Sequence, residues 1–326
     1  MLYNPKVSIV IPAYNASNYL SEAIDSALAQ DYNKIEIVVV NDGSKDDGKT
    51  RDVALSYGDK IKYFEKENGG SSSALNVGIS NMTGEWFSWL SHDDLYYKNK
   101  ISQQVALMNE MLSSGVGEDA LCKTAFFSPA DIIDSKGVII KKANARKSQK
   151  HLQIFENEDA NGHLISYPIQ VGFYGCSCLI HRSTFDTIGG FDEKKHLLND
   201  LDMWFRLYAN GYSIKYIPKA LVMERIHSGQ VSRTIGYSYH NPEQDDFWKE
   251  SLEWLEANRS NDKELFLNYA KIAYKKTRYD DGAKAFDVAT KIDSSLKMKI
   301  SAYKAFLKVE SQLINFAKRI YFLVRT

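Results

Sequence analysis

The sequence lacks three features that would assign the chain to a class at once. No stretch approaches the roughly 18 apolar residues of a membrane-spanning helix, and the N-terminal apolar run, closed by Pro12, is too short for a signal peptide. Net charge is also absent, because 41 basic side chains balance 41 acidic ones. The three cysteines are an odd number without metal-finger spacing, which favours reduced thiols. We therefore expect a cytoplasmic protein with no nucleic-acid partner, at most peripheral at the inner face of the membrane.

Two glycine-rich nucleotide motifs are absent as well. No G-x-G-x-x-G follows the first predicted strand, and no G-x-x-x-x-G-K-[ST] occurs anywhere, which excludes a dinucleotide fingerprint and a P-loop. What is present is a chain of 326 residues with 44% hydrophobic and 25% charged side chains, as in soluble globular proteins. This length allows one large domain or two ordinary ones.

Apolar runs and helical patterns alternate along the first hundred residues. Pro12 stops the first β-branched run, and Asn41 stops the second. Strands that alternate with helices at this interval predict a doubly wound, mostly parallel α/β sheet with helices on both faces. The predicted strands are residues 7–11, 35–40, 61–64 and 86–90, and the predicted helices follow Asn15 and Ser17 or span residues 46–57 and 74–80.

Past about residue 115 the pattern becomes less regular. A polar stretch over residues 141–162 has little periodicity and predicts a long surface region. We expect one α/β domain over about residues 1–240, with halves at about 1–114 and 115–240. The strands predicted in the second half are residues 121–127, 137–140, 175–180 and 221–225, and the helices are residues 183–188 and a segment from Asn199 that Gly211 caps.

The last part of the chain, residues 241–326, has helical periodicity throughout and predicts an α-helical extension. Its final segment, residues 296–324, places lysines and arginines beside aromatic side chains. This pattern allows a helix that lies on a membrane surface, but it favours a helix that packs on the domain or dimerises. Either way, the C-terminal helices are the predicted site of membrane contact or homo-oligomerisation.

Polar loops follow three of the predicted strands. They are residues 12–15, 41–44 and 91–94. Because open α/β sheets bind ligands outside the carboxyl ends of their strands, these loops are expected to line one crevice.

The third of these loops carries the adjacent carboxylates of Asp93 and Asp94 directly after an aromatic strand. Their oxygens are hard ligands that suit Mg²⁺ or Mn²⁺, and such ions commonly share their coordination with ligand phosphates. The pair therefore indicates a phosphate-bearing substrate, plausibly a nucleotide. A turn or a helix N-cap remains the alternative reading of two aspartates at this point.

Four further side chains have the chemistry for such a site. Asp42 can accept the imide hydrogen of a pyrimidine, and Tyr14 can stack on the base. His227, after a predicted strand, can supply a nitrogen ligand to the same ion, although a lone histidine is more often not a ligand. Asp200 begins a predicted helix, where it is either a cap or a functional carboxylate.

Taken together and in order, these segments resemble family 2 glycosyltransferases of the GT-A fold. The resemblance covers about residues 5–232. The segments that carry it are VSIVIPAYN at 7–15, VVNDGS at 39–44, NGG at 68–70 with Ala74 and Asn76, WLSHDD at 89–94, GGFDE at 189–193 and NDLDMWFR at 199–206.

The resemblance implies an inverting, metal-dependent hexosyltransferase that uses a nucleotide-sugar, usually a UDP-sugar, with Mn²⁺ or Mg²⁺. Its acceptor would be a glycan or glycoprotein, in polysaccharide biosynthesis or protein glycosylation. The first half would bind the nucleotide and the second half the acceptor. The same resemblance implies that the nucleoside is held by Pro12, Tyr14, Asn15 and Asp42, and that Asn76 lies by the diphosphate. It also implies that Asp93 and His227 ligate the metal, that Asp94 contacts the donor sugar or the surroundings of the ion, and that Asp200 is the general base.

Three positions depart from the family pattern. Ser91 stands where the metal motif usually begins with Asp, Asn199 replaces a Glu, and Leu75 replaces an Arg on the donor side. The aspartates assigned to metal and base are kept, so activity is still expected, but the donor is poorly constrained. The alternatives are a catalytically silent scaffold that acts through its helical tail and a metal-dependent nucleotidyltransferase, which would need a basic, glycine-rich first loop.

Overall fold

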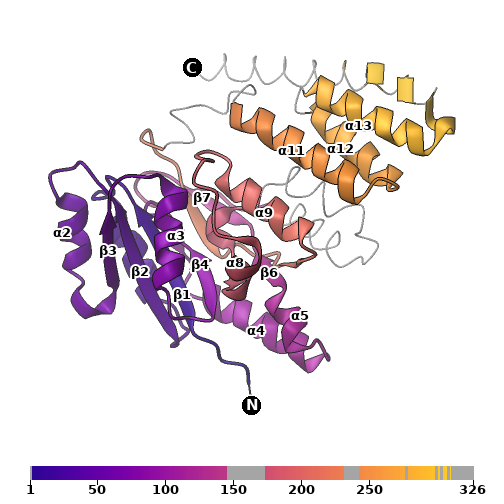
Figure 1. The fold of residues 1–326 in the computed structure, drawn as a ribbon. Helices are drawn as coiled ribbons and strands as arrows, with labels where there is room; N and C mark the ends of the chain where they lie inside the picture. The colour runs from indigo at the N-terminus through magenta and orange to yellow at the C-terminus, as the bar shows by residue number, and fades with distance from the viewer. Residues whose placement is uncertain are drawn as a thin grey trace. The chain divides into compact units, whose positions relative to one another are not determined.

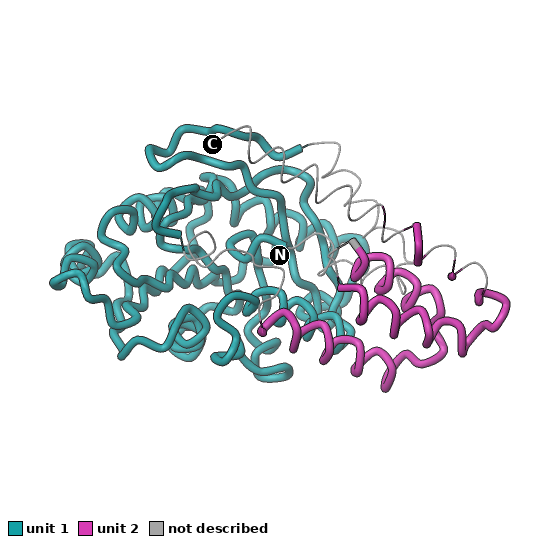
Figure 2. The backbone as a smooth tube through the Cα atoms, turned by 90° about the horizontal axis from the view of Figure 1, so that it is seen from above, with its two compact units in different colours: residues 1–157, 173–234 teal, residues 158–172, 235–326 magenta. Residues whose placement is uncertain are grey.

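The computed structural model describes residues 2–144, 173–230, 242–275, 278–297, 300, 301, 304–306 and 309. The chain divides into two compact units, residues 1–157 with 173–234 and residues 158–172 with 235–326 (Figure 2). The domain boundary predicted near residue 240 lies outside the described residues, as do most of the polar stretch 141–162 and most of the final segment 296–324.

The first unit is built on a five-stranded sheet in the order β3-β2-β1-β4-β9. Strands β3, β2, β1 and β4 are parallel, and Figure 1 shows them side by side in that order. Only β9 runs antiparallel, beside β4. The predicted doubly wound, mostly parallel sheet is therefore confirmed. The strands are β1 (Val7–Ala13), β2 (Ile35–Asp42), β3 (Lys62–Lys66), β4 (Trp86–Trp89) and β9 (Ile180–His181).

Close packing joins this sheet to its helices. Every residue of β1 is buried, and α3 lies against β1 and β2 (Figure 1). The approach is tight at Gly78, where an added Cβ would come within 2.2 Å of Val10 Cγ1. The helices of this half are α1 (Leu20–Leu28), α2 (Lys49–Leu55), α3 (Ser71–Asn81) and α4 (Lys100–Ser113), with a short 3₁₀ turn at Gly58–Lys60.

The prediction that Pro12 ends the first strand is wrong, because β1 continues through it to Ala13. Proline has no N–H to donate and is normally confined to places where a strand lacks a neighbour. The pairing between β1 and β4 stops at Val10 and Trp89, so Pro12 has a strand partner only on the β2 side.

Two smaller sheets complete the first unit. One has the order β5-β11-β7-β8, and the other pairs β10 with β6. The helices predicted at residues 183–188 and from Asn199 are confirmed as α8 and α9. The elements are β5 (Leu95–Tyr96), α5 (Glu118–Cys122), β6 (Thr124–Phe127), β7 (Ala130–Ile133), β8 (Ile139–Lys141), α8 (Ser183–Ile188), α9 (Asn199–Ala209), β10 (Ser213–Tyr216) and β11 (Val222–Arg225).

Two strand predictions in this part are wrong. Residues 121–127 begin in helix α5 and become β6 only at Thr124. Residues 175–180 open with a 3₁₀ turn at Gly175–Ser177 in place of a strand. At this turn Gly175 lies so close to the ring of Trp89 that an added Cβ would come within 2.6 Å of it, so a larger residue would not fit here.

The second unit is helical over its described residues, as predicted for the C-terminal extension. Helices α12 and α13 pack closely, and Figure 1 shows α11 beside them. A Cβ at Gly282 would lie 2.5 Å from the Tyr274 ring, so glycine permits the close contact. In the described part of the chain, no helix is long and apolar enough to cross a membrane. The helices are α11 (Pro242–Asn258), α12 (Lys263–Lys275) and α13 (Tyr279–Ile292), followed by a 3₁₀ turn at Ser294–Leu296.

Candidate active site

The three predicted loops meet at the carboxyl edge of the main sheet. The Asn15 N–H donates to Ser44 Oγ at 2.9 Å, and Asn15 Oδ1 accepts the Lys45 N–H at 2.7 Å, which joins the first loop to the second. The third loop reaches the first through His92, whose Nδ1 lies 3.3 Å from the Pro12 carbonyl oxygen. Tyr14 stays 40% exposed beside Asn15, which leaves its ring free to contact a ligand.

Asp93 and His227 form a pair across 134 residues of sequence. His227 Nε2 lies 3.0 Å from Asp93 Oδ2, and both side chains are mostly buried. The other ring nitrogen, Nδ1, accepts the N–H of Gly229 at 3.2 Å, so in the neutral ring Nε2 carries the proton and donates it to Asp93. The Tyr19 ring stacks at a tilt 4.9 Å from the imidazole and restrains it further.

Asp94, by contrast, is directed into the protein and is 1% exposed. Its carboxylate accepts hydrogen bonds from the Tyr174 hydroxyl, from Cys176 Sγ at 3.2 Å and from the Arg225 backbone N–H at 2.9 Å. Burial and, to a lesser extent, the like charge of Asp93 together raise the pKa of Asp94 to about 8, although these hydrogen bonds oppose the shift. The side chain thus anchors its loop, and its predicted contact with a donor sugar stays a prediction.

Arg225 is the residue that sequence reasoning missed. Its fully buried guanidinium donates from Nε to the Asp93 carbonyl oxygen at 2.7 Å and pairs with Glu22 at 2.7 Å. It also donates to the Ser135 carbonyl oxygen at 3.2 Å and lies 4.6 Å from the centre of the Tyr19 ring. An arginine at the end of a predicted strand that begins with three apolar residues was the available signal, because buried arginines are almost always paired.

Asp42 is also fully engaged by the protein. One carboxylate oxygen accepts from Lys66 Nζ at 2.8 Å and from the Gly69 N–H at 3.0 Å. The other accepts from the Gly70 N–H at 2.7 Å and from Asn68 Nδ2 at 3.2 Å. Asp42 therefore organises the glycine-rich turn before α3, and its predicted contact with a base stays a prediction.

Asn76 connects α3 to the turn before α9. Its amide forms two hydrogen bonds with the Phe191 backbone, at 2.9 and 2.8 Å, and a third with Glu193 at 3.0 Å. Gly190 packs against it, since a Cβ there would come within 2.3 Å of Asn76 Oδ1. The structure places this side chain at a loop contact, and the predicted role beside a diphosphate stays a prediction.

Asp200 lies in the first turn of α9 and is partly buried. Its Oδ1 accepts the Leu201 N–H at 2.7 Å. Burial raises its pKa to about 6, against the lowering effect of its backbone hydrogen bonds. A carboxyl group with this pKa can exchange a proton near neutral pH.

The start of α9 is fixed from both sides. Asn199 Nδ2 donates to Ser71 Oγ at 3.1 Å, which ties it to the start of α3 and hence to the turn that Asp42 organises. On the inner face Trp204 Nε1 donates to the Phe173 carbonyl oxygen at 3.2 Å, and its ring packs edge-on against Phe127. The helix end that carries Asp200 therefore belongs to the same edge of the sheet as the other predicted residues.

The arrangement of Asp93 and His227 can be compared with the coordination that a divalent ion requires. Asp93 and His227 present one oxygen and one nitrogen side by side at 3.0 Å. Among the described residues no group of three or more His, Cys, Asp or Glu side chains converges as a metal site. Two protein ligands suit an ion such as Mg²⁺ that takes its remaining positions from waters and ligand phosphates. The residues present thus fit a shared ion that displaces the proton of His227 Nε2, and not a closed protein cage.

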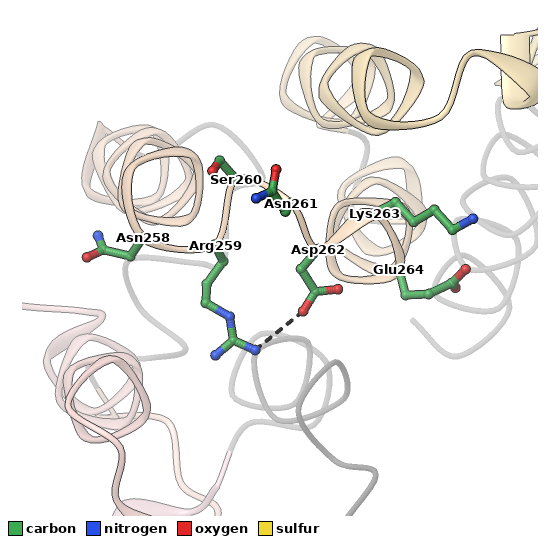
Figure 3. A pocket seen from close by; sticks show the side chains of 7 residues that line it. All are labelled: Asn258, Arg259, Ser260, Asn261, Asp262, Lys263 and Glu264. Atoms are coloured by element: carbon green, nitrogen blue, oxygen red, sulfur yellow. Dashed lines mark hydrogen bonds and ion pairs between the residues drawn. The ribbon is translucent and has the colours of Figure 1, made fainter.

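A hollow of about 510 Å³ lies elsewhere, in the second unit. Residues 258–264, which run from the end of α11 to the start of α12, line it, and Arg259 lies 3.3 Å from Asp262 in an ion pair. Figure 3 shows these side chains around the turn. None of the predicted site residues contributes to it. It is an open polar turn between helices, so the strand-end site remains the candidate.

A doubly wound sheet with these loops is the architecture of GT-A glycosyltransferases, and solved structures of that class share the fold. One is TarS of S. aureus in complex with UDP-GlcNAc, with a TM-score of 0.62 at 16% identity over 94% of this chain and 89% of that one. Another is a mannosyltransferase from Pyrobaculum calidifontis with GDP-Man and Mn²⁺, with a TM-score of 0.56 at 19% identity over 96% and 88% of the two chains.

Sequence comparisons identify the family within this fold class. The family model described as Glycosyl transferase family 2 matches residues 8–167. An uncharacterised glycosyltransferase of Rickettsia prowazekii is 44% identical over 72% of this chain and 68% of its own length. The chain therefore belongs to glycosyltransferase family 2. A second uncharacterised glycosyltransferase, from Rickettsia felis, is 46% identical over 78% of this chain, which spans only 39% of that relative's length.

Proposed function

We propose that this chain is an inverting glycosyltransferase that moves a sugar from a nucleotide-sugar, with a UDP-sugar as the expected donor, to an acceptor hydroxyl. The observation that carries the proposal is the pairing of Asp93 with His227 at the carboxyl edge of the sheet. A carboxylate and an imidazole in contact there suit a divalent ion, Mn²⁺ or Mg²⁺, that is shared with a diphosphate. When bound, such an ion supplies positive charge to the leaving diphosphate.

On the donor side, the residues of the chain bind and orient the nucleotide. Tyr14 is exposed enough to stack on the base, beside Asn15 in the loop after β1 and near Pro12 at the end of that strand. Asp42 acts on the nucleoside directly or through the turn that it organises with Lys66. Asn76, Asp94 and Arg225 hold the surrounding loops in place.

On the acceptor side, Asp200 is proposed as the general base. Its pKa of about 6 leaves it mostly ionised at neutral pH, yet basic enough to take a proton from the attacking hydroxyl. Attack from the face opposite the diphosphate inverts the anomeric centre, so an α-linked donor gives a β-glycoside. The acceptor would belong to a cell-surface polysaccharide or a glycoprotein glycan.

The decisive experiment measures the release of nucleoside diphosphate from a panel of nucleotide-sugars, with Mn²⁺ or Mg²⁺ added. UDP-GlcNAc and GDP-mannose head the panel, because structural neighbours were solved with these donors. Slow hydrolysis of at least one donor is expected even without an acceptor. If no donor is turned over with either metal, the chain is not an active transferase.

Two variants then test metal-dependent nucleotide binding and base catalysis separately. Asp93→Ala is expected to lose metal-dependent binding of the nucleotide, whereas Asp200→Asn keeps binding and loses transfer by roughly two to four orders of magnitude. Asp52→Asn, an exposed carboxylate on α2, is the matched control and should change neither quantity. Normal transfer by Asp200→Asn would reject the base assignment while leaving the enzyme assignment intact.

A further inference from the structure

Three aliphatic side chains project into solvent at the hairpin between β7 and β8. Val138 is 59% exposed, Ile139 is 40% exposed and Ile140 is 57% exposed. Within the described ranges no other strongly exposed large hydrophobic residues are consecutive. Successive residues of a strand point to opposite faces, so the exposure of both Ile139 and Ile140 means that neither face of β8 packs on a core.

The turn of this hairpin is defined by specific hydrogen bonds and by one glycine. The Asp134 N–H donates to the Val138 carbonyl oxygen at 2.9 Å, and the Asp134 carboxylate accepts hydrogen bonds from the N–H groups of Lys136 and Val138, both at 2.9 Å. Gly137 supplies the φ of 80° that the turn requires. Residues 136–142, hereafter the hairpin tip, are thus held outward by specific bonds, which keeps the aliphatic groups exposed.

Lysines flank the three aliphatic residues. Lys136 precedes them, Lys141 and Lys142 follow, and all three are exposed. The sequence from residue 135 to residue 150 contains six basic side chains and no acidic one. Asp134, the nearest acid along the chain, is engaged by the turn itself.

This combination indicates the kind of partner. Lysines at an edge strand discourage pairing with another strand, which argues against a second copy as the occupant. Aliphatic groups surrounded by lysines instead match a membrane interface, where apolar side chains enter the acyl boundary and ammonium groups remain among the phosphates. We propose that the hairpin tip docks on an anionic lipid surface, with Val138, Ile139 and Ile140 inserted.

The hairpin tip is joined to the candidate active site by one side chain. Arg225 donates to the Ser135 carbonyl oxygen at one end and to the Asp93 carbonyl oxygen at the other. A Cβ at Gly137 would lie 3.9 Å from this guanidinium, which shows how closely the turn covers it. Docking would therefore hold the Asp93 loop near the lipid surface. The docking itself does not depend on the proposed function.

The test is sedimentation of the full chain with phosphatidylcholine vesicles that contain or lack phosphatidylglycerol. Binding is expected only with the anionic lipid and should weaken as salt rises, because exposed charges are screened. Lys141→Gln with Lys142→Gln should weaken binding by about 25-fold, since each lysine near such a surface contributes about fivefold. Val138→Ser with Ile140→Ser should weaken it by at least about tenfold.

The matched control removes the same kinds of group from another surface. Lys49→Gln with Leu55→Ser takes one exposed lysine and one 55% exposed leucine from α2, and should bind like the parent protein. Absence of binding by the parent protein, or hairpin-tip variants that bind as tightly as it does, would overturn the proposal. So would a dimer that Ile140→Ser dissociates, because the surface would then pair two copies. Vesicle binding needs no substrate, so its failure leaves the proposed transferase activity untouched.

Discussion

Asp93 and Asp94 are adjacent in the sequence, yet their carboxylates have different surroundings. Asp93 pairs with His227 and stays partly accessible, whereas Asp94 is buried under donors from Tyr174 and Arg225. The difference arises from segments 80 to 134 residues away, which bring those partners to one loop. At the scale of single residues, function therefore depends on which distant side chains reach each carboxylate.

The first prediction concerns the pH dependence of stability through Asp200. Its pKa is raised from 3.8 to about 6, so folding favours the protonated acid. This contribution to stability is full below about pH 4 and is lost as pH rises through 6. From about pH 4 to about pH 7, the unfolding free energy of the parent protein should fall by on the order of 2 kcal/mol relative to that of Asp200→Asn. Chemical denaturation of both proteins across this pH range measures the difference.

Asp186→Asn supplies the control for that measurement, because Asp186 is an exposed carboxylate on α8. Its unfolding free energy should follow the parent protein at every pH. Parallel curves for the parent protein and Asp200→Asn would show that Asp200 is not the group that titrates near 6.

The second prediction is that transfer has the opposite dependence on pH. A general base works only when ionised, so the rate should rise with pH along a limb with an apparent pKa near 6. Initial rates of nucleoside diphosphate release across pH, at saturating donor, give this limb. A rate that is flat from about pH 5 to 8 would assign base catalysis to another group.

The third prediction concerns Arg225. Its buried guanidinium donates hydrogen bonds to the Glu22 carboxylate and to the carbonyl oxygens of Asp93 and Ser135. Replacement by Met leaves the two carbonyl groups without their donor, and we expect a loss of about 3–5 kcal/mol in denaturant unfolding. Arg225→Lys should recover only part of this, because an ammonium cannot reproduce the planar fork.

Comparison with Glu22→Gln separates the stability contributed by the Arg225–Glu22 salt bridge from that contributed by the hydrogen bonds of Arg225 to backbone carbonyl groups. The Glu22 side chain is 48% exposed, so its substitution should lower stability by no more than about 1 kcal/mol. If Glu22→Gln and Arg225→Met destabilised the protein equally, the ion pair alone would explain the effect and the contacts to the backbone would carry none of it.

Sequence patterns predicted which residues lie at the candidate site, but they did not predict the contacts that those residues make within the protein. Strand-end position and residue type identified Asp93 and His227, and the structure brings these two into contact. Residue type gave Asp42 a contact with a base, and the family resemblance gave Asn76 a place beside a diphosphate. Both stay predictions, and within the protein their side chains bond to Lys66 and to the Phe191 backbone. Such partners follow from tertiary approach, which spacing in one sequence does not encode.

At the scale of elements, periodicity predicted the main sheet and failed where tertiary packing decided the backbone. Strand β1 runs through Pro12 because its β4 neighbour has already ended. Residues 175–180 are apolar and β-prone, yet Gly175 turns under the ring of Trp89. Residues 118–122 form a helix although an apolar run begins within them. For Pro12 and Gly175, the neighbours that decide the backbone are distant in sequence and override a local preference.

The fourth prediction tests the closest contact between a helix and the sheet. Gly78→Ala in α3 would normally favour the helix by up to about 1 kcal/mol. Here the new Cβ would meet Val10 Cγ1 at 2.2 Å, so we expect a net loss of about 1–3 kcal/mol in unfolding free energy. Urea denaturation of the purified variant measures it.

A double-mutant cycle with Val10→Ala shows whether that contact is the cause. Val10→Ala removes the methyl groups that the added Cβ would strike, and its own cavity is partly filled by the new alanine. The double variant should therefore lose less stability than the two single variants summed. Simple additivity would place the cost of Gly78→Ala somewhere other than Val10.

At the scale of the whole molecule, the proposed chemistry is confined to the first unit. All nine predicted site residues, from Pro12 to His227, lie in residues 1–157 and 173–234. The second unit supplies helices whose described residues include none of them. This division matches the sequence pattern, in which strand and helix signals give way to helical periodicity alone.

The fifth prediction follows from this division. A chain that ends at residue 241 keeps every predicted site residue and every side-chain contact described for them, so it should bind UDP with Mn²⁺ as tightly as the full chain in titration calorimetry. Asp93→Ala in the shortened chain should abolish the metal-dependent part. Light scattering on both chains then reports the role of the removed helices, since a fall from dimer to monomer would assign association to them. A shortened protein that unfolds cooperatively but no longer binds UDP would show that the second unit completes the donor site.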